Sequence, residues 1–173
     1  MDDDVVDDAL KRHVVDKKPC SLENLVCTLR PAYNKMKPLE GRSLILCFGS
    51  TGSGKSTMLN SLLYGSESLH KTPIYEEVPT KNGKTRQVKR TVVDVKLEGQ
   101  GFKIGHSRVY SQTFIPTWVE DPNFNQLWVD IAGFGDTNGD LIEYINTFIG
   151  KKIFNIAKDI KIIMPFTCGE IQD

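Results

Sequence analysis

The sequence has few cysteines, no long apolar run and no excess of either charge. Its four cysteines, Cys20, Cys27, Cys47 and Cys168, show no Cys-x-x-Cys spacing, which favours reduced thiols over a disulfide framework. No apolar run approaches the ~20 residues of a membrane-spanning helix, and the acidic start Met1–Asp4 argues against a signal peptide. We therefore expect a soluble cytoplasmic protein.

The balance of charge also narrows the classes of partner. Lysine and arginine total 22 residues and aspartate and glutamate total 22, so the formal net charge is zero. A neutral chain has no overall field that attracts nucleic acid. The 173 residues leave room for one domain of ordinary size with a real core.

What the sequence does have is a run that matches the phosphate-binding P-loop pattern, Gly-x-x-x-x-Gly-Lys-Ser. The apolar run Ser43–Phe48 precedes it, as expected of a strand buried on both faces. A helical pattern follows, with Leu59, Leu62 and Leu63 on one face and Gly65 at its end. The residues expected to bind a nucleoside triphosphate are Gly49, Ser50, Thr51, Gly52, Ser53, Gly54, Lys55, Ser56 and Thr57.

The residue types of this loop suit an anion. Its glycines let successive backbone N–H groups point inward, while the next helix directs the positive end of its dipole to the same place. Lys55 would reach the β- and γ-phosphates, and the Ser56 hydroxyl would bind Mg²⁺. The simpler interpretation is a glycine-rich turn that only joins a strand to a helix.

A second motif narrows the class. The segment from Gln126 to Gly133 is an apolar strand that ends in Asp-x-x-Gly. This pattern can place the Asp130 carboxylate near Mg²⁺ and the Gly133 N–H near a γ-phosphate. Alone it is weak evidence, because a strand often runs into a glycine turn. Together with the P-loop it predicts a G domain.

The P-loop with its following Met58–Leu63, and the run from Asp130 to Thr137, resemble the translation-factor-related GTPases, most closely the septin and AIG1-like branch and more distantly dynamin-like proteins. Ala132 stands where those families usually carry proline. The resemblance implies an α/β fold, a three-layer P-loop NTPase sheet with helices on both faces, that binds GTP and Mg²⁺. It also implies a switch threonine that closes over the metal. Thr113 is the preferred candidate and Thr117 the alternative, because a hairpin from Phe114 to Ile131 is predicted around them.

The sequence departs from Ras-like GTPases at a catalytic position. Phe134 occupies the position after Gly133 where Ras-like enzymes place a water-orienting glutamine. Ser53, Asp136 or a residue supplied across a nucleotide-facing homodimer or filament are the alternatives. We therefore expect a GTP-binding switch, with Lys55 and Thr113 as catalytic residues and slow or assembly-dependent hydrolysis.

The base-reading motif Asn/Thr-Lys-x-Asp of G domains is not found after Gly133. The run Lys161–Phe166 is predicted to be the next strand, and the favoured explanation is that the sequence is a fragment. Two alternatives stay open: an ATP-using P-loop ATPase, against which Ile131 stands where those enzymes carry glutamate, and a nucleotide-binding module without catalysis.

The remaining segments predict the domain layout. We expect a helical leader over residues 1–40 and an incomplete G domain over 41–173, with a β insertion at about 66–105. Asn82-Gly83 signals the hairpin of this insertion. The insertion carries a basic cluster for which a solvated face is favoured over contact with phosphates or a membrane: Lys81, Lys84, Arg86, Lys89 and Arg90. A helix is predicted over 141–149, interrupted at Gly150.

Overall fold

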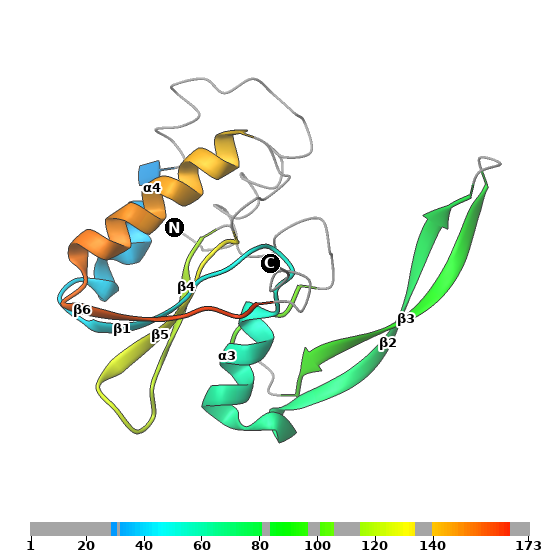
Figure 1. Ribbon diagram of the computed structural model, residues 1–173, viewed down its shortest axis with the longest axis horizontal. Helices are drawn as coiled ribbons and strands as arrows, with labels where there is room; N and C mark the ends of the chain where they lie inside the picture. Colours follow the sequence, from blue (N-terminus) through cyan, green and yellow to red (C-terminus); the bar gives the residue numbers. More distant parts are fainter. Residues whose placement is uncertain are drawn as a thin grey trace, which may run out of the picture.

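The computed structural model describes residues 29–30, 32–80, 84–96, 101–105, 115–133 and 140–166. Residues 29–30 and 32–36 are helical. The further elements are η1 (Lys37–Leu39), β1 (Ser43–Cys47), α3 (Lys55–Tyr64), η2 (Ser66–Ser68), β2 (Leu69–Pro79), β3 (Thr85–Val95), β4 (Thr117–Glu120), β5 (Gln126–Asp130), α4 (Asp140–Ile156) and β6 (Asp159–Ile163). Figure 1 shows their arrangement.

The main sheet has four strands in the order β4-β5-β1-β6. The central strand β1 is parallel to both β5 and β6, whereas β4 and β5 form an antiparallel hairpin. The predicted hairpin is therefore confirmed. The strand predicted over Lys161–Phe166 begins two residues earlier, at Asp159, and ends three residues earlier, at Ile163. It ends before Pro165, which has no N–H to donate to the ladder.

Side chains of β1 alternate between the two faces of this sheet. Leu44 and Leu46 belong to a core with Leu127 and Val129, which α4 covers with Ile145, Ile149 and Ile153.

The other face of the sheet has a smaller core, in which Cys47 packs with Leu59 of α3 and Phe102. Figure 1 shows α3 and α4 on opposite sides of the strands. The predicted α/β class is thus confirmed as a mixed α/β fold.

Two details of the predicted helices are wrong. Leu62 is exposed, and buried Asn60 takes part in packing α3 instead, since its amide donates to Phe102 O and accepts from Phe102 N, both at 2.8 Å. In addition, α4 continues through Gly150 to Ile156. A helical glycine costs about 1 kcal/mol relative to alanine, and the buried stripe that continues to Ile153 outweighs this cost.

The predicted β insertion is a separate two-stranded sheet, β2-β3, in which eleven residue pairs run from Leu69 opposite Val95 to Pro79 opposite Thr85. Figure 1 shows this ribbon extending away from the main sheet. Thr80 closes its described end through its N–H and hydroxyl, which both donate to Lys84 O at 2.7 and 2.6 Å. Residues 81–83, which include the predicted Asn-Gly turn, lie outside the described residues.

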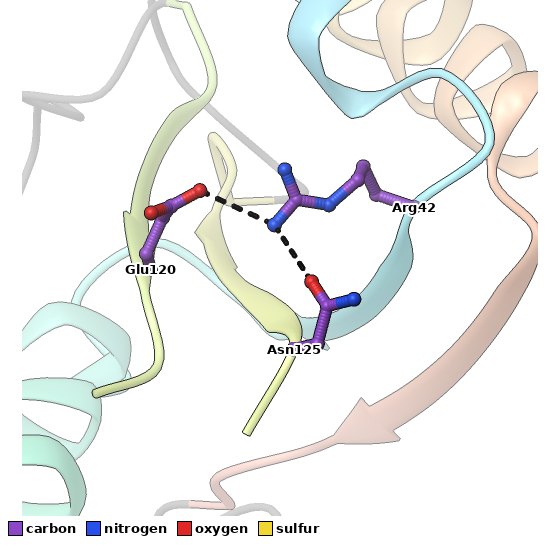
Figure 2. Close-up of polar contacts among 3 residues, drawn as sticks. All are labelled: Arg42, Glu120 and Asn125. Carbon is purple, nitrogen blue, oxygen red and sulfur yellow. Dashed lines mark hydrogen bonds and ion pairs between the residues drawn. The ribbon is translucent and has the colours of Figure 1, made fainter. Parts of the chain in front are cut away.

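The segment before β1 packs into the core. Ala32, Met36 and Leu39 are buried in the same core cluster as Leu44, and the described helical residues before β1 extend to 36. At the start of β1, Arg42 donates to Glu120 Oε1 at 3.2 Å and to Asn125 Oδ1 at 3.4 Å (Figure 2). This exposed contact ties the β4–β5 hairpin to β1 and contributes at most about 1 kcal/mol.

Candidate functional site

The predicted phosphate loop connects β1 to α3. Gly52 and Gly54 adopt positive φ of 79° and 86°. This region favours glycine, because the Cβ of any other residue would lie too close to a backbone carbonyl oxygen. Gly54 is the N-cap of α3, and among the described residues no side chain caps this helix and no acidic residue lies in its first turn. The first N–H groups of α3 and its dipole are therefore directed at the loop without a competing carboxylate.

Lys55 lies inside this loop. Its side chain is only 8% exposed, and its ammonium donates to Gly49 O at 3.1 Å and to Ser50 O at 2.9 Å. A buried ammonium needs such partners, because its desolvation is costly. The loop therefore holds one buried positive charge. Thr57, another predicted site residue, lies in the first turn of α3.

The second motif reaches the same place. Asp130 at the end of β5 pairs in register with Cys47 at the end of β1, and its Oδ2 accepts a 2.6 Å hydrogen bond from the Ser56 hydroxyl across 74 residues of sequence. Asp130 is 1% exposed. The structure thus brings together Lys55, Ser56 and Asp130, three of the predicted site residues.

Gly133 packs directly against the phosphate loop. A Cβ built at Gly133 would lie 2.5 Å from Thr51 N and 2.7 Å from both Thr51 Cα and Oγ1. Such distances are far inside van der Waals contact, and two of these atoms are backbone atoms that cannot rotate away. At Gly49 a Cβ would lie 3.1 Å from Ser53 Oγ and 3.3 Å from Pro165 O. Glycine is therefore required sterically at 133 and favoured at 49.

Two hydroxyl groups of the loop are buried without a hydrogen-bond partner in the described part of the chain, Thr51 Oγ1 and Ser53 Oγ. An unsatisfied buried hydroxyl costs about 1–3 kcal/mol. Both flank Gly52, within the loop predicted to hold phosphate. The N–H groups of the loop would suit a ligand with several acceptor oxygens.

Sequence reasoning missed the place of Cys47 beside these groups. Burial raises the pKa of its thiol to about 12, with a further rise from the Asp130 carboxylate and an opposing effect of Lys55. The thiol is therefore neutral at physiological pH and unreactive. The signal was its position at the end of β1, since parallel strands in register place their last residues side by side.

The remaining predicted residues are only partly placed. Thr113, Phe134 and Asp136 lie outside the described residues. Thr117, the alternative switch threonine, is exposed at the start of β4, opposite Asp130 in the ladder. Of the two threonine candidates, the structure therefore locates only the alternative.

Comparison with protein-family models, with curated proteins and with solved structures gave no match for this chain. Within the described ranges, no helix is long and apolar enough to cross a membrane. The interpretation of the site therefore depends on its own geometry and on the resemblance of the two motifs.

Proposed function

We propose that this chain is a nucleotide-binding switch that holds a nucleoside triphosphate and Mg²⁺ in the loop Gly49–Thr57, with GTP as the nucleotide that the motif resemblance implies. The observation that carries the proposal is the 2.6 Å hydrogen bond from Ser56 to Asp130 beside Lys55. Two motifs distant in sequence meet at the start of a helix whose dipole favours anions. A glycine-rich turn that only joins a strand to a helix would not require the second motif to lie beside it.

The residues present fit Mg²⁺. Its preferred ligands are oxygen atoms, and it is usually held by one or two protein oxygens together with phosphate and water. Ser56 Oγ and the Asp130 carboxylate provide such oxygens, one as a direct ligand and the other directly or through water. When bound, the ion neutralises charge on the β- and γ-phosphate oxygens.

The switch in this proposal is the contact between Gly133 and Thr51. Because the two backbones touch, a phosphate group that enters beside Thr51 must move the Gly133 loop or bind its N–H. Nucleotide occupancy is thereby transmitted to the chain that leads into α4. Thr113 as a closing threonine stays a prediction from the resemblance.

We propose that hydrolysis is slow or depends on assembly. The residue after Gly133 is Phe134, and an apolar side chain cannot orient an attacking water. A homodimer or filament through the nucleotide face would supply the missing group. A chain that binds nucleotide and never hydrolyses it is the second possibility, favoured by the same phenylalanine.

The test is a titration of the purified chain with fluorescent GTP and ATP analogues, with and without Mg²⁺, for wild type, Lys55→Ala and the control Lys71→Ala on the exposed ribbon. We expect Mg²⁺-dependent binding that Lys55→Ala weakens at least 100-fold and Lys71→Ala leaves unchanged. Competition by unlabelled GTP but not ATP supports the GTP switch, and preference for ATP replaces it by an ATPase. A folded chain that binds neither nucleotide refutes the proposal.

A further inference from the structure

The β2–β3 ribbon has two outer edges, and its hydrogen bonds show which main-chain groups lie on them. Near the far end Thr80 N–H donates to Lys84 O at 2.7 Å, and at the base Lys96 N–H donates to Ser68 O at 2.8 Å. Both pairs continue the register of the ribbon and join even-numbered residues. Hydrogen-bonded and non-hydrogen-bonded pairs alternate along an antiparallel ladder. The N–H and C=O groups of the odd-numbered residues therefore point outward, away from the other strand.

The outer edge of β2 is blocked by proline. Pro73 and Pro79 are both odd-numbered residues of β2, so each removes an N–H group that would otherwise point outward. Because their N–H positions face outward, both prolines leave the ladder with β3 intact. Natural sheets use proline in this way to prevent another strand from pairing with an edge.

The outer edge of β3 has no such block. Its eleven residues, Thr85–Val95, contain neither proline nor glycine. At the base of the strand, Val95 N–H donates to Asp94 Oδ1 at 2.8 Å, which leaves residues 85–93 as the open part of the edge. Among the described residues no third strand pairs with β3. A two-stranded ribbon that contacts chiefly itself is marginally stable in water, so a third strand along this edge would stabilise it.

The side chains of β3 favour an acidic strand over a second copy of the same strand. One face of β3 alternates basic and aliphatic side chains: Arg86, Val88, Arg90 and Val92. Opposite charges that face each other on neighbouring strands are stabilising, and like charges are destabilising. The whole strand carries three basic residues and one acidic residue. Two copies of β3 therefore repel each other, as basic residues on an edge generally ensure.

We propose that the outer edge of β3 binds an acidic, extended segment of a partner polypeptide as a third strand. The outward N–H and C=O groups of residues 85–93 supply the main-chain hydrogen bonds that give affinity, and the facing side chains give specificity. Such a segment places acidic residues opposite Arg86 and Arg90 and an aliphatic residue opposite Val88 between them. This inference does not rest on the proposed nucleotide site, because the ribbon extends away from the main sheet (Figure 1).

The experiment titrates the chain with the labelled peptide Val-Thr-Glu-Thr-Val-Thr-Glu-Thr-Val, whose glutamates and valines share one face of a strand. The matched control peptide carries lysine in place of glutamate. Fluorescence anisotropy measures affinity, and we expect saturable binding of the acidic peptide and at least about tenfold weaker binding of the basic one. Amide hydrogen exchange followed by NMR locates the contact. The outward amides of Gln87, Lys89 and Thr91 should exchange more slowly in the complex, whereas those of Val88 and Arg90, which lie in the ladder with β2, should change little.

Three variants test the edge itself. Thr91→Pro removes one outward N–H without removing a bond of the ladder with β2, so it should weaken the acidic peptide about tenfold or more. Lys71→Pro makes the same change on the edge of β2 that proline already blocks, and it should leave peptide binding unchanged. Arg86→Glu, at an exposed position, should weaken the acidic peptide and strengthen the basic one.

If Thr91→Pro disrupts the ribbon, Arg86→Glu decides, since an exposed substitution keeps the strand. No saturable peptide binding by the folded wild type overturns the site, as does protection of amides elsewhere than on β3. Equal affinity for the two peptides overturns the preference for acidic strands. If sedimentation shows a dimer and the β3 amides are protected without peptide, the occupant is a second copy and the proposed partner is wrong. Peptide binding without nucleotide binding refutes the proposed function and leaves this site intact.

Discussion

The predicted phosphate loop and the β2–β3 ribbon flank the same helix, α3, and both carry lysines. In the loop, Lys55 is 8% exposed and held by two carbonyl oxygens. In the ribbon, Lys71 and Lys89 are exposed on strands that contact chiefly each other. Burying an ammonium group is costly, so a buried lysine is a better indicator of a functional site than an exposed one. The basic cluster of the ribbon was predicted to be a solvated face, and the side chains of Lys84, Arg86 and Lys89 are indeed exposed.

The largest effect is expected from a substitution that disrupts the loop and leaves the ribbon intact. Such a substitution fills the close contact between Gly133 and Thr51. Gly133→Ala places a methyl group against backbone atoms 2.5 and 2.7 Å away, so we expect a loss of about 2–3 kcal/mol in the free energy of unfolding and at least a 100-fold loss in nucleotide affinity. Urea denaturation and nucleotide titration measure the two effects. The matched control is Gly150→Ala, which meets open space and should stabilise the chain by about 0.5–1 kcal/mol. Equal behaviour of the two variants would contradict the close contact.

The second prediction separates metal binding from folding. Asp130→Asn keeps the size of the side chain and an acceptor for Ser56 but removes the charge, so we expect nucleotide binding to lose its dependence on Mg²⁺ and to weaken about tenfold or more in Mg²⁺ buffer. Titrations with Mg²⁺ and with a chelator measure this. Asp159→Asn is the control, because Asp159 accepts an equally short 2.6 Å bond from Ser43 at the exposed start of the strands. A Mg²⁺ dependence retained by Asp130→Asn would remove Asp130 from the metal site.

The third prediction concerns Cys47 beneath the loop. Since its pKa is raised from 9.0 to about 12 in the folded chain, the unfolded chain releases the thiol proton first as pH rises. Stability from this group is therefore complete below pH 9 and is lost between pH 9 and 12. We expect the free energy of unfolding of the wild type to fall by roughly 1 kcal/mol between pH 8 and 10, and that of Cys47→Ala to fall by less. Urea denaturation of both proteins at the two pH values measures these changes. An equal fall in both proteins would show that folding does not raise the pKa of the Cys47 thiol.

Much of the fold followed from local pattern, and the errors have physical causes. The apolar run of β1, the loop glycines and the hairpin of β4 and β5 identified their elements, because each carries a local signal: a short buried apolar run, a required φ, or two strands joined by a short turn. The exposure of Leu62 and the continuity of α4 through Gly150 depend on which surfaces meet, which periodicity does not encode.

The candidate site was predictable to the level of its motifs only. The types of residue identified Lys55, Ser56 and Asp130, whereas the place of the buried Cys47 beside them depends on strand register. The contact of Gly133 with Thr51 joins two loops from different strand ends, so no single stretch of sequence contains it.

The smallest expected effect belongs to the ribbon. The double variant Arg86→Gln and Lys89→Gln removes two exposed charges from β3, and exposed substitutions usually change stability by less than about 0.5 kcal/mol. We expect nucleotide affinity within twofold of wild type, measured in the same titration. Because the ribbon extends away from the main sheet in Figure 1, its charges act on the loop only through screened solvent. A tenfold loss would mean that the ribbon contacts the nucleotide, and exposure would then no longer separate the functional lysines of this chain from its solvated ones.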